Sequence, residues 1–328
     1  MCNRRYKLDR ILVTGGGGFI GSHLARHLYE QGNFVRTVDI KYDDYIQEKY
    51  CNEKLNLDLR ILDNCIKATE NINKVYNLAA NMGGIGFITA VGAEVMHDNT
   101  LINTFMLEAA RQNNVNRYLF TSSACVYPTF KQTNPEIEGL KEEDAYPADP
   151  DNFYGWEKLY TEKMIEAYQR DHKMNIRVLR YHNIYGPEGT YKGGREKSPA
   201  AIARKIVEAS NPGTMEIWGD GKQTRSFCYV DDAVTATILL MESDYDKPLN
   251  IGSDRLITID QLADMIIDIS GKEITKKYDL SAPQGVRGRN ADLTLMKKIL
   301  RWEPHITLEQ GMAKTYKWIN EQINSIIE

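Results

Sequence analysis

The sequence predicts an α/β fold of the doubly wound type, in which helices cover both faces of a parallel sheet. Three observations support this prediction. Strand-like and helix-like segments alternate from the start of the chain, the strand segments are short apolar runs, and a glycine-rich turn separates the first strand from the first helix. Strands buried on both faces and joined through helices are typical of a parallel sheet.

The expected elements are regular at first and less regular after Tyr181. Strands are expected at 10–14, 34–38, 74–79, 117–121 and 176–180, and helices at 19–31, 99–112 and 156–172. A further strand and helix are expected within 227–241. Stretches rich in Gly and Pro at 186–199 and 211–221 indicate the loops of a second, smaller α/β lobe.

The composition excludes several classes of protein. The 328 residues suffice for one large or two intimate domains, and the net charge of -4 argues against a nucleic-acid binder, which needs a basic surface. No apolar run reaches the roughly 20 residues that span a bilayer, and the N-terminal residues carry no signal-peptide pattern, so we expect a soluble cytoplasmic protein without membrane contact. The cysteines are scattered and odd in number, so neither a disulfide framework nor a metal site is expected. They are Cys2, Cys51, Cys65, Cys125 and Cys228.

The glycine-rich turn predicts a dinucleotide site. Gly15, Gly18 and Gly21 form a GxxGxxG spacing between the first strand and a helix that begins at Phe19 and Ile20. Residues without a Cβ let the backbone approach a pyrophosphate, and the helix N-terminus offers free N–H groups. A glycine-rich segment alone is a weak signal, but the strand before it and the helix after it are the context that a Rossmann-type fold requires.

Acidic and small residues extend this site. Asp39 ends the second strand, where a carboxylate accepts from ribose hydroxyls and repels a 2′-phosphate, so NAD is favoured over NADP, although Lys41 weakens the discrimination. Asp58 is expected in a loop that meets the adenine, and Ala79 in a loop close to the dinucleotide. We therefore expect an NAD-binding domain formed by residues 1–180 and 226–252 and a substrate lobe formed by 181–225 and 253–328.

A YxxxK pair indicates redox chemistry. Tyr154 and Lys158 lie one helical turn apart, so their side chains share a face. An ammonium beside a phenol favours phenolate, which suits a tyrosine that removes a proton from a sugar hydroxyl. Ser123, at the end of a strand about 30 residues earlier, is placed to hydrogen-bond the reacting oxygen, unless it is only a turn serine. The YxxxK pattern also occurs by chance, but its position in a chain with a nucleotide-binding fold favours the catalytic interpretation.

These segments together resemble one family. The strings GGGGFIGSH, NLAA, TSSACVYP, YGWEK and HNIYGP resemble the extended short-chain dehydrogenases/reductases that modify nucleotide sugars, over nearly the whole chain. Within that group AANMGGIGF, SSACVYPTFKQ, GTYKGGREKSPAA and GVRGRN resemble the GDP-mannose 3,5-epimerase family most. The resemblance implies bound NAD, a GDP-hexose substrate and a homodimer, whose four-helix interface the helices at 99–112 and 156–172 are expected to form.

The resemblance also implies a reaction. NAD oxidises C4 of the hexose with the help of Tyr154 and Lys158, the protons on C3 and C5 become acidic, and C4 is reduced again after epimerisation. The resemblance gives the proton transfers to Cys125 and Lys197. A thiol near a cation ionises readily and an ammonium is a mobile proton donor, so both roles are chemically sound. The residues alone are equally compatible with structural roles, in which Cys125 is a small buried apolar residue and Lys197 is a solvated cation on a loop.

The remaining site residues are expected to bind the substrate. Met82, Gly83 and Gly84 would let a loop pass close to the sugar, unless they form only a tight turn, and Asn183 resembles a family position near the sugar or phosphate. Arg225 and Arg287, the latter in a string that also contains Arg289, match phosphate geometry, although each is equally compatible with a surface role.

Other functions are weaker matches. A GDP-fucose synthase-like epimerase and reductase would use NADPH, which the carboxylate of Asp39 disfavours. Such an enzyme would also carry a histidine as the acid at the position of Lys197. A 4,6-dehydratase would carry acidic residues where Ala124 and Cys125 stand, and a simple C4 epimerase needs no Cys/Lys pair. A non-catalytic NAD sensor would have lost part of the YxxxK pair.

Overall fold

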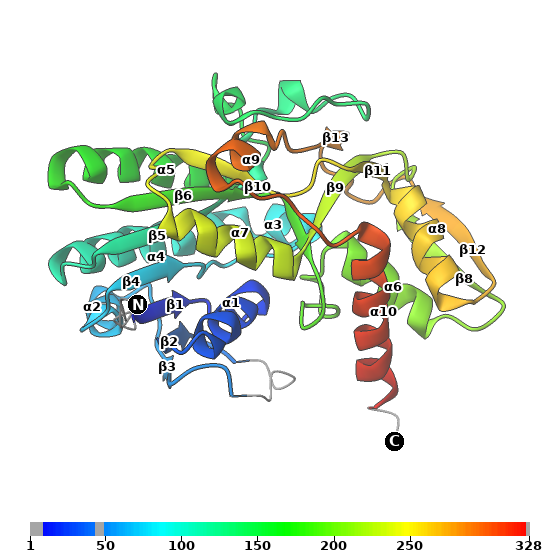
Figure 1. Cartoon of the computed structure of the whole chain (residues 1–328). Helices are drawn as coiled ribbons and strands as arrows, with labels where there is room; N and C mark the ends of the chain where they lie inside the picture. The colour runs from blue at the N-terminus through cyan, green and yellow to red at the C-terminus, as the bar shows by residue number, and fades with distance from the viewer. Residues whose placement is uncertain (1–8, 43–48, 326–328) are drawn as a thin grey trace.

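A seven-stranded parallel sheet forms the centre of the chain, whose computed structural model describes residues 9–42 and 49–325 (Figure 1). Cys2 and the rest of the N-terminal segment considered above lie outside these residues. The strands are β1 (Arg10–Thr14), β2 (Phe34–Asp39), β3 (Glu53–Asn56), β4 (Lys74–Asn77), β5 (Arg117–Ser123), β6 (Ile176–Tyr181) and β10 (Pro248–Ile251). Their order is β10-β6-β5-β4-β1-β2-β3, with every neighbouring pair parallel. The predicted Rossmann-type doubly wound sheet is confirmed.

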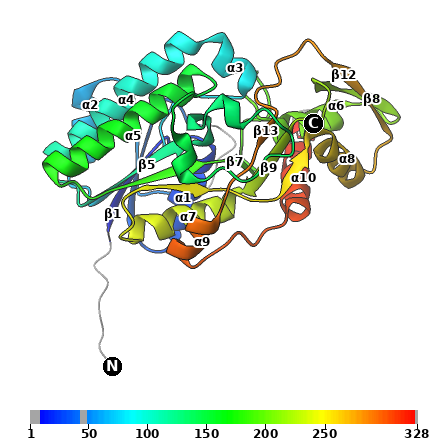
Figure 2. The ribbon, with the colours of Figure 1, turned by 90° about the horizontal axis from the view of Figure 1, so that it is seen from above.

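Helices cover both faces of this sheet, and the alternation of side chains along the strands explains how. Leu12, Val38 and Phe120 join one apolar cluster with α2 (Leu62–Thr69), α4 (Gly92–Gln112) and α5 (Phe153–His172). Their neighbours Val13 and Leu119 point the other way, into a cluster with α1 (Phe19–Glu30) and α7 (Val230–Glu242). Figure 2 shows α4 and α5 side by side, with α1 and α7 across the sheet from them.

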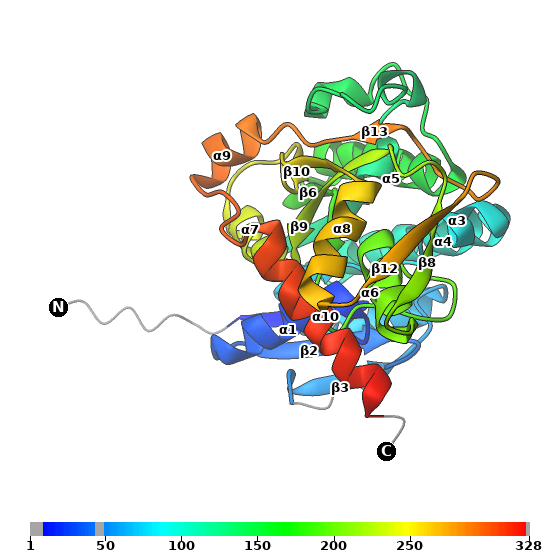
Figure 3. The same ribbon diagram turned by 90° about the vertical axis from the view of Figure 1, so that its right-hand side faces the viewer.

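The second lobe is built from short strands and three longer helices. A second sheet contains β7 (Asn183–Tyr185), β9 (Thr224–Tyr229), β11 (Leu256–Thr258) and β13 (Gly288–Arg289), and β8 (Gly213–Trp218) pairs with β12 (Ile274–Asp279). The helices are α6 (Ser198–Glu208), α8 (Ile259–Ser270) and α10 (Leu308–Asn324), which stand together at one end of the molecule (Figure 3). Short elements elsewhere are α3 (Ile85–Ala90), α9 (Thr294–Leu300) and the 3₁₀ turns η1 (Ala124–Val126), η2 (Thr129–Lys131) and η3 (Glu142–Ala145).

The structure adds elements and extends several that the sequence predicts. Strand β3 is an edge strand whose residues alternate between partly buried and exposed, so it lacks the apolar run of a buried strand. Helix α4 begins at Gly92 and α5 at Phe153, where Asn152 caps the helix by accepting the Gly155 N–H at 2.9 Å. Strand β9 lies in the second sheet, while α7 packs on the central sheet. The division into an NAD-binding domain and a substrate lobe remains a proposal.

Three further findings bear on function. Within residues 9–42 and 49–325, the four cysteines are free thiols and no group of three or more His, Cys, Asp or Glu side chains is arranged to hold a metal ion. None of the helices in these ranges is long and apolar enough to cross a membrane.

Candidate functional site

The strand order reverses between β1 and β4, and the glycine turn lies at this point. Gly15 has a φ of 68°, in the left-handed region, and its Cα would carry a Cβ 3.0 Å from the Ala79 nitrogen. A Cβ on Gly21 would lie 2.0 Å from the Gly15 carbonyl oxygen, so a side chain there would push the helix away from the turn. Gly18 caps α1, whose first turn holds Phe19 and Ile20. The turn therefore forms the open cradle at a switch point in which a dinucleotide pyrophosphate fits.

The carboxylates predicted to contact the cofactor stand at the ends of β2 and β3. Asp39 accepts the Gly17 N–H at 3.0 Å, which ties the glycine turn to the second strand. Asp58 follows β3, and both of its oxygens accept from Arg60. These hydrogen bonds lower the pKa of Asp58, against the opposing effect of burial. A contact between Asp58 and adenine would thus involve the Asp58–Arg60 pair.

Tyr154 and Lys158 are both buried in the first turns of α5. Tyr154 is 6% exposed and Lys158 only 1% exposed. The Lys158 Nζ lies 5.4 Å from the centre of the Tyr154 ring and 4.8 Å from that of Phe120. Helix α5 packs on η1, which carries Cys125, so the redox pair and the cysteine share one site.

Burial and neighbouring groups favour the neutral phenol form of Tyr154. Burial raises the pKa of Tyr154 well above its usual value, and the nearby Glu157 and Cys125 raise it further, whereas its hydrogen bond with Ser123 lowers it. Removal of a hydroxyl proton by Tyr154 therefore needs a cation close to the phenol, and the Lys158 ammonium lies beside the Tyr154 ring.

Glu157 is a site residue that the sequence reasoning missed. Its side chain is fully buried, and its Oε1 lies 3.7 Å from the Lys158 Nζ. A chain of hydrogen bonds holds it: Thr14 donates to Asn77 at 2.8 Å, Asn77 to Asn103 at 3.1 Å, and Asn103 to the Glu157 Oε2 at 3.1 Å. Burial lowers the pKa of Lys158, and the Glu157 carboxylate opposes this. Burial also raises the pKa of Glu157, and the Lys158 charge opposes that rise, so each group favours the charged form of the other. The place of Glu157 next to the lysine in sequence is the signal that could have marked it.

Cys125 faces a buried guanidinium from the far end of the chain. Arg289, in β13, donates to the Cys125 Sγ at 3.4 Å, to Asp151 at 3.1 Å and to Gln132 at 2.6 Å. Burial opposes the Arg289 charge, but Cys125 and Asp151 together raise its pKa. The Cys125 N–H donates to the Ser123 Oγ at 3.2 Å, which joins the cysteine to the redox residues. The Arg289 guanidinium thus places a positive charge directly against the sulfur of Cys125.

Lys197 lies at the start of α6, on the loop that packs against the segment after β4. It is partly buried and forms the N-cap of the helix. Burial lowers its pKa, as does the charge of Arg289, whereas Cys125 raises it. These interactions bring Lys197 into the electrostatic surroundings of Cys125, and a lowered pKa makes its ammonium a better acid near neutral pH. The structure thus brings together the two residues expected to transfer protons.

The predicted phosphate ligands differ in how they are held. Arg225 pairs in register with Arg289 on adjacent strands and donates to the Thr224 carbonyl at 2.7 Å. Burial, together with the charge of Arg289, lowers the pKa of Arg225 to about 9. A cation in such surroundings is stabilised by an added anion. Arg287, by contrast, forms a two-pronged ion pair with Asp220 at 3.0 and 3.1 Å, with which a phosphate would have to compete.

The other substrate-binding candidates lie on loops around the site. Asn183 begins β7 and donates to the Ser226 carbonyl at 3.0 Å, which fastens β7 to β9. Met82, Gly83 and Gly84 follow β4 and lead into α3. A Cβ on Gly84 would lie 2.4 Å from the Glu196 carbonyl oxygen, so this loop packs tightly on the loop that carries Lys197.

Comparisons with known proteins agree with this site. Residues 11–252 match the family model described as the NAD dependent epimerase/dehydratase family. The chain is 47% identical to GDP-mannose 3,5-epimerase 1 of Oryza sativa subsp. indica over 315 residues, which are 96% of this chain and 82% of that protein. It is 45% identical to GDP-mannose 3,5-epimerase of Arabidopsis thaliana, over 96% of this chain and 83% of that protein. GDP-L-fucose synthase of Escherichia coli strain K12 is 30% identical, over 95% and 97% of the two chains.

Solved structures are similar over the whole chain. UDP-glucose 4-epimerase of Thermotoga maritima with UDP-glucose has a TM-score of 0.87 at 27% identity, over 95% of this chain and 99% of that chain. MoeE5 in complex with UDP-glucose and NAD has a TM-score of 0.81 at 27% identity, over 95% and 99% of the two chains. The family resemblance predicted from the motifs is confirmed.

Proposed function

The chain belongs to the NAD-dependent epimerase/dehydratase family, and from this premise we propose that it is a GDP-mannose 3,5-epimerase. The enzyme interconverts GDP-D-mannose with GDP-L-galactose and GDP-L-gulose. NAD is its cofactor: when bound, it takes a hydride from C4 of the hexose and later returns it. The similarity to plant epimerases at 45–47% identity, against 30% for a GDP-L-fucose synthase, supports this function over net reduction of a keto sugar.

One observation carries the proposal beyond similarity: Cys125 lies against the Arg289 guanidinium, with Lys197 in the same electrostatic surroundings. A C4 redox enzyme that only inverts C4 needs no such pair. An epimerase at C3 and C5 needs one group to remove a proton α to the ketone and another to deliver a proton to the opposite face. We assign the first role to the Cys125 thiolate and the second to the Lys197 ammonium.

The surrounding cations suit a diphosphate. Arg225 and Arg289 are close enough for the charge of one to lower the pKa of the other, and Asp151 is the carboxylate that pairs with Arg289. We assign the diphosphate of the substrate to Arg225, with Arg287 joining it if the Asp220 pair opens. Met82, Gly83, Gly84 and Asn183 remain proposed contacts to the sugar side of the substrate. Asp39 and the Asp58–Arg60 pair remain proposed contacts to the adenosine of NAD.

Isotope exchange tests the function directly. The purified protein is incubated with GDP-mannose in deuterated water, with a catalytic amount of NAD and no NADPH. We expect isomers of unchanged redox level that carry deuterium at C5, or at C3 and C5, by NMR and mass spectrometry. If no deuterium enters and no isomer forms, the assignment fails, and consumption of NADPH with a 4-keto-6-deoxy sugar would then establish the reductase alternative.

Substitution of Glu157 by glutamine is expected to move the alkaline limit of C4 oxidation to lower pH. Lys158 must carry a proton in this step, burial lowers the pKa of Lys158, and the Glu157 carboxylate opposes that effect. Without the carboxylate, Lys158 loses its proton at a lower pH. The measurement is the formation of reduced nicotinamide against pH. Glu166→Gln, an exposed glutamate on the same helix, is the control, and an unchanged alkaline limit in Glu157→Gln would refute the role.

We propose that the protein is a homodimer joined through α4 and α5. Exposed apolar side chains gather on these two helices: Phe153 is 58% exposed, Trp156 42%, Tyr160 54% and Met96 38%. Phe153, Trp156 and Tyr160 follow one another at helical spacing, so they lie on one face of α5. Adjacent helices with a shared apolar face are suited to a four-helix contact between two copies.

Trp156→Glu is therefore expected to convert a dimer into a monomer, because a carboxylate would be buried at the contact without a partner. Light scattering at micromolar protein gives the mass of both proteins. Leu280→Glu, at an exposed leucine in the second lobe, should leave the mass unchanged. A monomeric unsubstituted protein would contradict the dimer.

We also propose a cytoplasmic location. Cys51, Cys65, Cys125 and Cys228 are free thiols, which are typical of a reducing compartment. Subcellular fractionation of the native cells tests this, and recovery in a secreted fraction would contradict it.

A further inference from the structure

Arg195 joins the loop that carries Lys197 to the loop that follows β4. Its guanidinium donates to the Asn81 Oδ1 at 3.1 Å and to the Met82 carbonyl at 3.3 Å. It also stacks on the Phe87 ring of α3, 3.8 Å from the ring centre. Its own carbonyl accepts the Gly84 N–H at 3.0 Å. One residue thus makes three contacts with the segment between β4 and α3 and a fourth with α3 itself.

A second anchor of this loop on the central domain lies earlier in the chain, where Glu188 pairs with Arg26 of α1 at 2.9 Å. At Gly193 and Gly194, immediately before Arg195, no described atom lies within 4 Å of where a Cβ would stand. The Glu196 side chain accepts from Gly194 and from Arg204 of α6, while its carbonyl packs against Gly84 of the loop after β4. The contacts of Arg195 with the segment after β4 lie nearer to Lys197 in sequence than the Glu188–Arg26 pair does, and they help to set how Lys197 stands relative to the cofactor side of the site.

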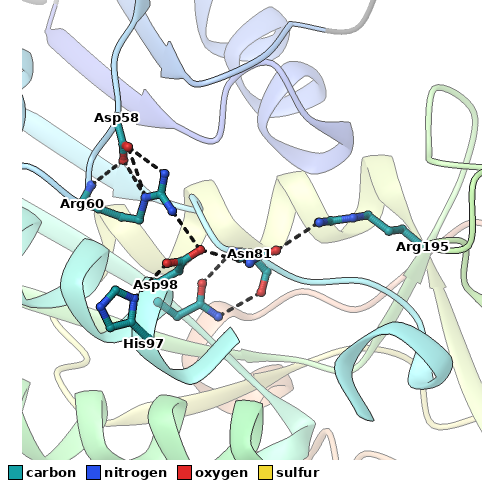
Figure 4. A network of polar contacts seen from close by, with 7 residues as sticks. Asp58, Arg60, Asn81, His97, Asp98 and Arg195 are labelled. Carbon is teal, nitrogen blue, oxygen red and sulfur yellow. Dashed lines mark hydrogen bonds and ion pairs between the residues drawn. The ribbon is translucent and has the colours of Figure 1, made fainter. Parts of the chain in front are cut away.

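The partners of Arg195 are themselves held in a network that reaches the predicted adenosine end of the cofactor site (Figure 4). Asn81 donates to the Asp98 Oδ2 at 3.2 Å, and Arg60 donates to the same oxygen at 3.1 Å. Arg60 in turn pairs with Asp58 at 2.8 Å. Asn81 also exchanges hydrogen bonds with Asn99 of α4 through its backbone. The Asn81 side-chain oxygen that accepts from Arg195 is therefore held in place by residues of the central domain and not by the loop that carries Lys197.

We infer that Arg195 is a positioning residue for Lys197: it fastens the Lys197 loop to the segment Asn81–Gly84 and so sets the proton donor opposite Cys125. The role rests on the proposed function, since Lys197 donates a proton only in the epimerisation steps. Arg195 is exposed and two residues from Lys197, and no contact joins it to Tyr154 or Lys158 among the described residues. Its loss should therefore impair proton transfer and leave C4 oxidation intact.

Arg195→Ala tests the inference through two independent measurements. Deuterium incorporation at C5 should fall about 10- to 100-fold, because small displacements of a catalytic group cost rates of this size. Formation of reduced nicotinamide on mixing with GDP-mannose should stay near that of the unsubstituted protein. Arg195→Lys should recover only part of the loss, because an ammonium can donate to the two oxygens but lacks the planar guanidinium that stacks on the Phe87 ring. Lys192→Ala removes another exposed cation from the same loop and is the matched control.

Amide hydrogen exchange provides the second measurement and needs no substrate. In Arg195→Ala the exchange of segments 81–88 and 191–198 should speed up, while Lys192→Ala leaves it unchanged. Unchanged exchange in these segments would overturn the inference even if the protein proves inactive on GDP-mannose. Equal losses of C4 oxidation and deuterium incorporation would also overturn it, since they would indicate a general structural role. Absence of deuterium incorporation by the unsubstituted protein would instead count against the proposed function.

Discussion

Cys125→Ala is expected to lower the incorporation of solvent deuterium into GDP-mannose by about 10²- to 10⁴-fold, the usual contribution of a general base. C4 oxidation should continue, because Tyr154 and Lys158 are untouched by the change. Reduced nicotinamide should therefore persist longer than in the unsubstituted protein, since the ketone can only return to the starting sugar. Absorbance of the reduced nicotinamide and mass spectrometry of the sugar follow the two events in one reaction.

The thiol group of Cys125 is also a contact of Arg289, so loss of activity must be separated from loss of packing. Cys65→Ala is a suitable control, because burial raises the pKa of Cys65 to about 12 and keeps this thiol neutral. Arg289→Lys should show the same selective loss of exchange as Cys125→Ala, in a milder form, if the guanidinium acts by favouring the thiolate. Normal deuterium incorporation by Cys125→Ala would remove the cysteine from the mechanism.

The central sheet was predictable because its signals are local. Apolar runs mark β1, β2, β4, β5 and β6, and the glycine turn at Gly15 indicated the fold and led to the proposed place of the cofactor. A strand was expected where β9 begins the unit within 227–241, but the two edge strands β3 and β10 and the short strands β7, β11 and β13 escaped prediction. These five strands are two to four residues long, and pairing with distant segments determines them more than their own pattern does.

The site was predictable in part for the same reason. Tyr154 and Lys158 share a helix, so their spacing already puts them on one face. The contact between Arg289 and Cys125 joins residues 164 positions apart, and no periodicity reports such a pairing. The sequence likewise favoured Arg287 as a phosphate ligand, whereas the structure pairs it with Asp220, 67 positions away. Contacts set by the packing of two lobes become visible only when both lobes are in place.

Tyr154→Phe is expected to lower C4 oxidation by about 10²- to 10⁴-fold, because the phenol oxygen that takes the C4 hydroxyl proton is gone. The ring fills the same buried space and keeps its contact with Lys158, so folding and cofactor binding should change little. Deuterium incorporation should fall by the same factor, although Cys125 and Lys197 are intact. The cause is chemical: the protons on C3 and C5 become acidic only after C4 has become a ketone.

Cys125→Ala and Tyr154→Phe are therefore expected to affect C4 oxidation and deuterium incorporation differently, and this difference tests whether oxidation precedes proton exchange. Cys125→Ala should separate oxidation from exchange, whereas Tyr154→Phe should lower both together. A synthetic GDP-4-keto-hexose supplied to Tyr154→Phe bypasses the oxidation, so deuterium should enter it at a rate close to that in the unsubstituted protein. If Tyr154→Phe still fails to exchange the ketone, the tyrosine takes part in the proton transfers as well, and the division of labour between α5 and the Cys125–Lys197 pair is wrong.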